Sequence, residues 1–187
     1  MSTATVLAGG AGSRLGGAKA TALLGGRPLI EHVLGAAREG GLEPVVVAKA
    51  DSPLPALDCR LLIEPQQPRH PLLGVVTALR ELREPAVVVC AADMPFVTGP
   101  LLAWLAAQEE PLVVTSAGGE LQPLLGRYEA SLLARLEAAL AEGLSMREVA
   151  WQLGARIAGA AELERFGDPV RLCSSINTPA ELAAAGG

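Results

Sequence analysis

The chain has 187 residues, half of them hydrophobic, with 20 acidic against 15 basic side chains and a net charge of −5. The acidic balance argues against a general nucleic-acid-binding protein, and an aromatic content of 3% leaves few side chains on which single-stranded bases could stack. The length predicts one domain, residues 1–187, with enough apolar side chains for a large core.

The first half of the chain alternates short apolar runs with amphipathic segments. Apolar runs that stop at Gly, Pro or charged residues predict strands buried on both faces. Periodic apolar positions between a Pro and a Gly pair predict helices. In chain order we expect a strand at 3–8, a helix at 28–39, strands at 44–48 and 60–63, a helix at 73–82 and a strand at 86–91.

The second half continues this alternation with clearer helix starts. Thr98 is expected to cap a helix, and the pairs Ser145 with Glu148 and Thr178 with Glu181 have the spacing of capping boxes. In chain order we expect a helix at 98–108, strands at 112–116 and 122–128, helices at 131–142 and 145–153, short strands at 156–158 and 170–173, and a terminal helix after 178.

Strands that alternate with helices at this spacing are typical of α/β proteins. We therefore expect a three-layer α/β/α arrangement, with a mostly parallel sheet and helices on both faces. Ligands of such sheets bind beyond the carboxyl ends of the strands. Two segments with residues suited to ligand binding follow such ends. They are the glycine-rich stretch after the first strand and the segment with Asp93 after the fourth.

The cysteine and histidine content argues against disulfides and against a histidine metal site. The cysteines are odd in number and widely spaced: Cys59, Cys90 and Cys173. This pattern favours reduced, mainly buried thiols over a disulfide framework or a zinc ribbon. His32 and His70 lie far apart in the sequence, so we expect no metal site built on histidine.

Two further features concern the core and the location of the protein. Trp104 and Trp151 occur at helical spacing among apolar residues, which predicts a place in the core or in an interface. The N-terminus shows no signal-peptide pattern, and no apolar run reaches the roughly eighteen residues of a membrane span. We therefore expect a cytoplasmic protein without a membrane segment.

The stretch VLAGGAGSRLGGAK, residues 6–19, runs from the first strand into a glycine-rich loop with two cations, Arg14 and Lys19, and no acid. Glycines let backbone N–H groups approach an anion closely, and the cations neutralise it. The loop lacks the G-x-G-x-x-G spacing of a dinucleotide site, and Lys19 comes one residue late for a Walker A loop. We interpret it as a phosphate-binding loop of another kind, the alternative being a glycine-rich turn without a ligand.

Outside this loop, Asp93 and Asn177 are the polar residues that best suit a functional site. Asp93 ends an otherwise apolar strand, and a carboxylate placed there, facing the loop, suits Mg²⁺. The alternative is an Asp that only caps a turn. From spacing alone Asn177 stays unassigned, because a helix start explains the residues that follow it.

Together these motifs resemble the nucleotidyltransferases with the Rossmann-like nucleotide-diphospho-sugar transferase fold, and more narrowly the MobA-like family of molybdenum cofactor guanylyltransferases. The similarity extends over nearly the whole chain. The stretches that carry it agree in order and spacing: LAGGxGSRLG at 7–16 with Lys19, GxPL at 26–29, PLxG at 71–74, ADMPFV at 92–97, QPL at 122–124 and NTPxEL at 177–182.

The resemblance implies an Mg²⁺-dependent transfer of GMP from GTP to the molybdopterin form of the molybdenum cofactor, with release of pyrophosphate. It implies catalytic roles for Arg14, Lys19 and Asp93, and metal ligation by Asp93 and Asn177. It places Glu64 near the base or ribose. The implied nucleotide-binding residues are Leu7, Ala8, Gly9, Gly10, Gly12, Ser13, Arg14, Lys19, Glu64 and Asp93. Proteins that deliver the pterin, or molybdoenzymes that receive it, are implied partners.

The chain departs from the family pattern at four positions that bear on the pterin side and the base contacts. Ala18 and His70 replace the usual Asp and Gly, while Lys49 and Ser175 replace two Asn. In the family, glycine at position 9 goes with guanine, whereas cytidylyl relatives more often have Ala there. A cytidylyl- or other NTP transferase with another phosphorylated acceptor, and a non-catalytic nucleotide- or cofactor-binding chaperone, therefore stay as alternatives.

Overall fold

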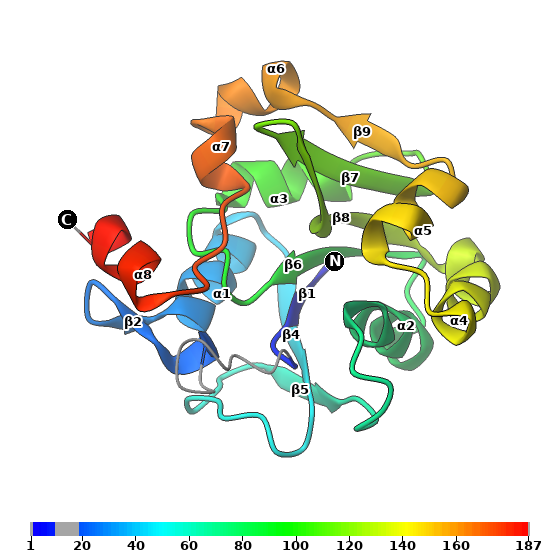
Figure 1. The fold of residues 1–187 in the computed structure, drawn as a ribbon, viewed down its shortest axis with the longest axis horizontal. Coiled ribbons are helices and arrows are strands. Elements are labelled where there is room, and N and C mark those ends of the chain that lie inside the picture. The colour runs from blue at the N-terminus through cyan, green and yellow to red at the C-terminus, as the bar shows by residue number, and fades with distance from the viewer. Residues whose placement is uncertain (1, 10–18, 187) are drawn as a thin grey trace.

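The computed structural model describes residues 2–9 and 19–186 (Figure 1). The strands are β1 (Thr3–Leu7), β2 (Leu23–Leu24), β3 (Arg27–Pro28), β4 (Glu43–Ala48), β5 (Arg60–Ile63), β6 (Ala86–Ala91), β7 (Leu112–Ala117), β8 (Glu120–Glu129) and β9 (Arg156–Ala158). The α-helices are α1 (Leu29–Glu39), α2 (Pro71–Leu82), α3 (Gly99–Ala106), α4 (Leu133–Glu142), α5 (Met146–Gln152), α6 (Ala160–Leu163), α7 (Pro169–Leu172) and α8 (Pro179–Gly186). Short 3₁₀ turns lie at Lys19–Thr21, Ala130–Leu132 and Glu164–Phe166.

The main sheet has seven strands in the order β5-β4-β1-β6-β8-β7-β9. The first four run parallel, and Val6 of β1 pairs with Val46 of β4 on one side and with Cys90 of β6 on the other. β8 runs antiparallel to both β6 and β7, and β7 pairs in parallel with β9. The sheet is thus mostly parallel, as predicted, and the parallel strands deliver their carboxyl ends to one edge.

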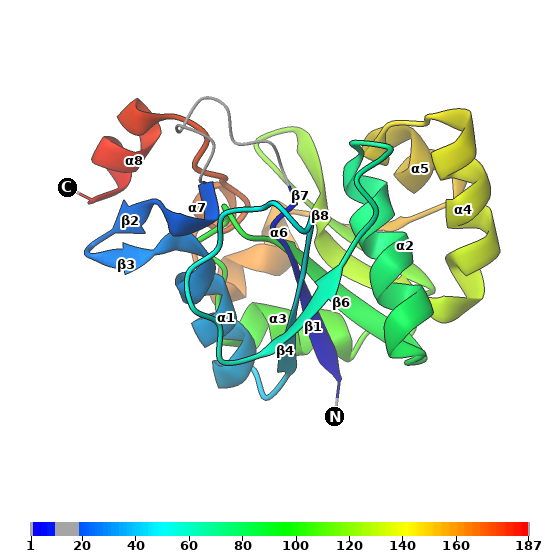
Figure 2. The same cartoon turned by 90° about the horizontal axis from the view of Figure 1, so that it is seen from below.

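Helices cover both faces of this sheet, which gives the expected three layers (Figures 1 and 2). The alternation of side chains along β6 shows how the two cores are divided. Val88 and Cys90 pack into the cluster that includes α1 and α3, whereas Val87 and Val89 pack into the cluster that includes α2, α4 and α5. Because both faces are buried, the strands read as continuous apolar runs, and this is why the sequence located them well.

Two segments differ from the sequence-based prediction. The expected strand at 170–173 is wrong, since Pro169–Leu172 forms helix α7. Asp168 accepts a hydrogen bond from the backbone N–H of Val170 (2.9 Å), so this segment starts with the N-cap and proline signature of a helix. The β2–β3 hairpin was not predicted, although Gly25 and Gly26, both with positive φ, form the two-residue turn that such hairpins favour.

The structure confirms some of the predicted helix caps and tryptophan positions and not others. The capping box of Ser145 and Glu148 is present at α5. Thr98 stands at the N-cap of α3, but its side chain makes no capping hydrogen bond. Trp104 is partly buried and stacks near Phe166, with ring centroids 5.6 Å apart. Trp151 is not in the core, because this side chain is 67% exposed on α5, and a place in an interface stays a prediction.

Among residues 2–9 and 19–186, no helix combines the length and the apolar character that a bilayer crossing requires. The three cysteines are free, as expected, and two of them are buried in the sheet region. Burial raises the pKa of the Cys90 thiol strongly, and it raises the pKa of Cys173 and of the less buried Cys59 as well.

These thiols should differ in their rates of alkylation. At pH 8 the raised pKa and the burial of Cys90 leave almost no accessible thiolate, and only the thiolate is the nucleophile. We expect iodoacetamide to modify Cys59 at least tenfold faster than Cys90 or Cys173 in the native protein, by mass spectrometry of tryptic peptides. In 6 M guanidinium the three rates should converge. Equal rates in the native protein would contradict the burial described above.

Candidate active site

The carboxyl ends of the parallel strands open into one cavity of about 320 Å³. The residues directly after β1, β4, β5 and β6 all line it, which follows from the parallel arrangement. Two backbone hydrogen bonds extend the strand pairing into the site, from the N–H of Ala8 to the carbonyl of Val47 (2.8 Å) and from the N–H of Glu64 to that of Ala48 (2.9 Å). Lys49 and Glu64, which directly follow β4 and β5, therefore stand on strand ends.

Three polar side chains meet at one end of this cavity. The ammonium group of Lys19 lies 3.1 Å from Oδ2 of Asp93 and also donates to Oδ1 of Asn177. These residues are far apart in the sequence. The backbone brings them together, because the N–H of Ile176 donates to the carbonyl of Asp93 at 2.8 Å. The segment before α8 is thereby attached to the end of β6.

Ser175 fixes the orientation of the Asn177 side chain. The Nδ2 of Asn177 donates to Oγ of Ser175 at 2.7 Å, so its Oδ1 turns toward Lys19. The carboxylate of Glu181 accepts the backbone N–H groups of Asn177 and Thr178, and the bond from Asn177 is the main cause that holds the pKa of Glu181 below its usual value. The predicted cap of α8 is thus present, and Ser175, where the family has Asn, supplies a hydrogen-bond acceptor.

The donor set at this end fits a divalent cation such as Mg²⁺. A carboxylate oxygen of Asp93 and an amide oxygen of Asn177 converge on one positively charged atom, Nζ of Lys19. Mg²⁺ prefers oxygen ligands and is commonly held by one or two carboxylates together with substrate phosphates. Within the described ranges, no cluster of three or more His, Cys, Asp and Glu side chains offers an all-protein metal cage. A metal bound here would complete its coordination shell with water or with substrate phosphate oxygens.

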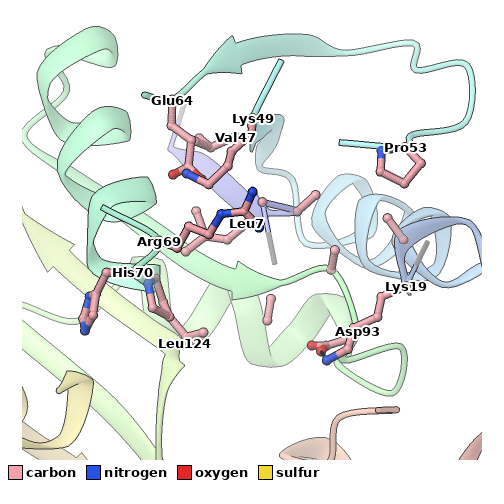
Figure 3. Close-up of a pocket in the computed structure, with 16 residues that line it drawn as sticks. Leu7, Lys19, Val47, Lys49, Pro53, Glu64, Arg69, His70, Asp93 and Leu124 are labelled. Atoms are coloured by element: carbon pink, nitrogen blue, oxygen red, sulfur yellow. Dashed lines mark hydrogen bonds and ion pairs between the residues drawn. The ribbon is translucent and has the colours of Figure 1, made fainter. Parts of the chain in front are cut away.

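A buried ion pair stands at the other end of the cavity (Figure 3). Nζ of Lys49 lies 3.1 Å from Oε1 of Glu64 and donates to the carbonyl of Pro65 at 2.7 Å. The side chains are only 7% and 6% exposed. Backbone closes around the carboxylate, since a Cβ on Gly9 would lie under 3.0 Å from Oε1, and one on Gly74 would lie 3.2 Å from Oε2. A side chain at position 9 would therefore displace the Glu64 carboxylate.

His70, a position at which the resemblance implied glycine, caps the start of helix α2. Its backbone is extended, with φ −139° and ψ 135°, so no glycine is needed there. Its Nδ1 accepts the backbone N–H of Leu72 at 3.1 Å, and Pro71 follows in the first turn. Helix α2 therefore begins two residues before the start that the sequence predicted.

The cap predicts a measurable loss on truncation. We expect His70→Ala to lower the free energy of unfolding by about 1 kcal/mol, since an unsatisfied N–H is left at the helix start. Urea denaturation followed by circular dichroism measures it. His70→Asn, which keeps a side-chain acceptor, should recover most of the loss. An equal loss in both variants would mean that the imidazole stabilises the protein by packing instead.

The structure gathers most of the sequence-predicted site residues around this one cavity. Leu7, Ala8, Gly9, Lys19, Glu64 and Asp93 line it, and Asn177 contacts Lys19. The remaining four lie outside the described residues: Gly10, Gly12, Ser13 and Arg14. Sequence reasoning missed Arg69 and Leu124 as lining residues and did not assign Lys49 to the site. A signal for Lys49 was available, because a cation directly follows the apolar run of β4.

A family model, the MobA-like NTP transferase domain, matches residues 4–174. The chain belongs to this family. A molybdenum cofactor guanylyltransferase of Cereibacter sphaeroides is 34% identical, with 96% of this chain and 93% of that relative covered. A probable molybdenum cofactor guanylyltransferase of Chloroflexus aggregans is 32% identical over 97% of this chain and 92% of its own length. Family membership makes the chain a nucleotidyltransferase, which confirms the resemblance seen in the motifs.

A solved structure of another protein has the same fold as this chain. Molybdopterin-guanine dinucleotide biosynthesis protein A of Archaeoglobus fulgidus superposes with a TM-score of 0.81 at 26% identity. The superposition covers 98% of this chain and 96% of that one, so the similarity includes both the sheet and the segment before α8. The fold class predicted from the sequence is confirmed.

Proposed function

We propose that this transferase moves GMP from GTP to the molybdopterin form of the molybdenum cofactor, giving the guanine dinucleotide form and pyrophosphate. The two relatives reported above are named as molybdenum cofactor guanylyltransferases, which supports GTP and the molybdenum cofactor as the substrates. The observation that carries the proposal is the cavity with its two charged ends, because it offers separate places for a polyphosphate and for a base.

The reaction is a displacement at phosphorus. A terminal phosphate oxygen of the pterin attacks the α-phosphorus of GTP, the new P–O bond forms, and the bond from the α-phosphorus to the bridging oxygen of the β-phosphate breaks. Such a step needs positioning and charge neutralisation more than a covalent nucleophile.

In this reaction we assign the phosphates to the end of the cavity that holds Lys19, Asp93 and Asn177. Lys19 binds the triphosphate and neutralises charge on the departing pyrophosphate, and Arg14 of the loop is proposed to assist it. Asp93 and Asn177 are the residues that would hold Mg²⁺, which would neutralise charge on the phosphates and orient them. The hydrogen bond from Asn177 to Ser175 keeps the amide oxygen aimed at this place.

Pyrophosphate release tests the proposal directly. Purified protein is incubated with molybdopterin cofactor, Mg²⁺ and each of the four NTPs in turn. We expect release with GTP and loss of turnover when EDTA removes the metal. Release with CTP and not GTP would reassign the chain to a cytidylyl transfer. Intact GTP binding without turnover on any phosphorylated acceptor would favour the non-catalytic chaperone.

A further inference from the structure

Strand β8 has a large bulge where it reaches the cavity. Val114 and Thr115 are adjacent on β7, yet their partners on β8, Gly126 and Gln122, lie four positions apart. The residues between these two partners include Leu124, which lines the cavity. Bulges beside active sites commonly redirect a side chain. Here the bulge brings a leucine of β8 to the lining.

A buried hydrogen bond holds the shape of this bulge. The hydroxyl of Tyr128 donates to the carbonyl of Pro123 at 2.7 Å, five residues back along the same strand. Tyr128 is 1% exposed, and burial raises its pKa, so the hydroxyl keeps the proton that it donates. Pro123 has no N–H that the bulge would leave unpaired. The carbonyl directly before Leu124 is therefore fixed from inside the core.

Leu124 lies on the side of the cavity that the nucleotide of the proposed function leaves free. The sheet order places β5 and β4, which Glu64 and Lys49 follow, on one side of β1, and it places β6 and β8 on the other. In the proposed function GTP extends from the first side to Asp93 after β6. Figure 3 shows Leu124 apart from the charged pairs at both ends. The wall from β8 is therefore left for the acceptor.

The lining here suits a ligand that is both flat and anionic. Leu124 supplies an apolar surface on which a ring can lie. Arg69, two residues before helix α2, lines the same cavity, and among residues 2–9 and 19–186 no acidic side chain pairs with it. An unpaired guanidinium attracts phosphate. The molybdopterin acceptor of the proposed reaction has a ring system and a terminal phosphate, so it is complementary to both features.

Resting on the proposed function, we infer that Leu124 contacts the ring of the acceptor and that Tyr128 is a positioning residue, which sets the acceptor affinity through the bulge. Tyr128 is buried and acts only through the carbonyl of Pro123. Without its hydroxyl the bulge loses this support, and Leu124 no longer stands at one fixed place on the wall. Binding of the acceptor then weakens, while GTP binding and the chemical step are unchanged.

The experiment separates acceptor binding from nucleotide binding. Calorimetry gives the Kd of molybdopterin, both alone and with α,β-methylene-GTP, in which the bond that must break is replaced. It also gives the Kd of GTP with Mg²⁺ and without any acceptor. We expect Tyr128→Phe to raise the Kd of molybdopterin by about fivefold or more, because the carbonyl of Pro123 loses its partner. The Kd of GTP, and kcat from pyrophosphate release at saturation, should stay within about twofold of the wild type.

Further variants test whether Tyr128 acts through Leu124. Leu124→Ala should raise the Kd of molybdopterin about tenfold, whereas Leu124→Met, which keeps an apolar side chain, should stay within about threefold of the wild type. In the background of Leu124→Ala, Tyr128→Phe should add less than about twofold. Leu121→Ala is the matched control, because Leu121 is a partly buried leucine of the same strand outside the described lining of the cavity. It should leave both Kd values within about twofold of the wild type.

An unchanged Kd of molybdopterin in Tyr128→Phe would overturn the inference, since the hydroxyl would then only stabilise the fold. Fully additive effects in the double variant would overturn it too, and so would a loss confined to the Kd of GTP, which would assign Leu124 to the nucleotide. Failure of the proposed function looks different. A wild type that releases pyrophosphate with CTP and not GTP would overturn GMP transfer, while the same rise in the Kd of molybdopterin would still support the inference. A wild type that binds no molybdopterin would overturn both.

Discussion

Asp93→Ala and Lys19→Ala are each expected to reduce turnover with GTP by about two orders of magnitude or more. The two side chains are paired at 3.1 Å at the phosphate end of the cavity. Loss of Asp93 removes the carboxylate proposed for the metal. Loss of Lys19 removes the cation proposed for the triphosphate. Pyrophosphate release at saturating pterin measures both effects.

The two variants should respond differently to the metal. Higher Mg²⁺ concentrations should restore part of the activity of Asp93→Ala. The activity of Lys19→Ala should stay low at the same Mg²⁺ concentrations. Asn177→Ala should lose less than either, because the proposed metal ligand that it removes carries no charge. Asp58→Ala is the control, since Asp58 is exposed and pairs with Arg38 on the surface. Full activity of Asp93→Ala would overturn the metal assignment.

The sequence predicted the central sheet well because burial on both faces leaves a simple signal. β5, β6 and β9 were predicted to the residue, and the other long strands within two residues. β6 is a continuous apolar run that is buried on both faces, whereas β5 is an edge strand on which Leu61 and Ile63 are exposed. The short elements were harder. α7 was mistaken for a strand because four residues carry little periodicity, and the decisive signal was the Asp168 cap before it.

The site was predictable in its residue types and less so in its contacts. Asp93 could be placed because an acid at the end of an apolar strand is chemically unusual. The hydrogen bond between Asn177 and Ser175 could not be predicted, because it depends on how the segment before α8 attaches to the end of β6. The same holds for Lys49 and Glu64, which meet only because β4 and β5 are neighbours in register.

Gly9→Ala is expected to lower kcat/KM for GTP by about 100-fold. The added Cβ would lie under 3.0 Å from Oε1 of Glu64 and 3.2 Å from its Cδ, so the carboxylate must move. Because Lys49 holds Oε1, this movement would disturb the ion pair. Disrupting a buried ion pair costs about 3–5 kcal/mol. If part of this free energy is lost from the binding of GTP, it is enough to lower kcat/KM by about 100-fold.

A matched pair of variants separates this clash from a general effect of adding a methyl group. Gly159→Ala adds the same Cβ where no atom lies within 4 Å, and it should leave kcat/KM unchanged within about twofold. Gly9→Ala combined with Glu64→Asp shortens the acid by one methylene, which should recover part of the lost activity. If Gly9→Ala alone keeps activity within threefold of the wild type, the carboxylate moves without consequence and Glu64 has no role in binding. If the loss falls on GTP and spares CTP, position 9 selects the base through the acid that it displaces, which gives a physical reason for glycine at this position in guanylyl transfer.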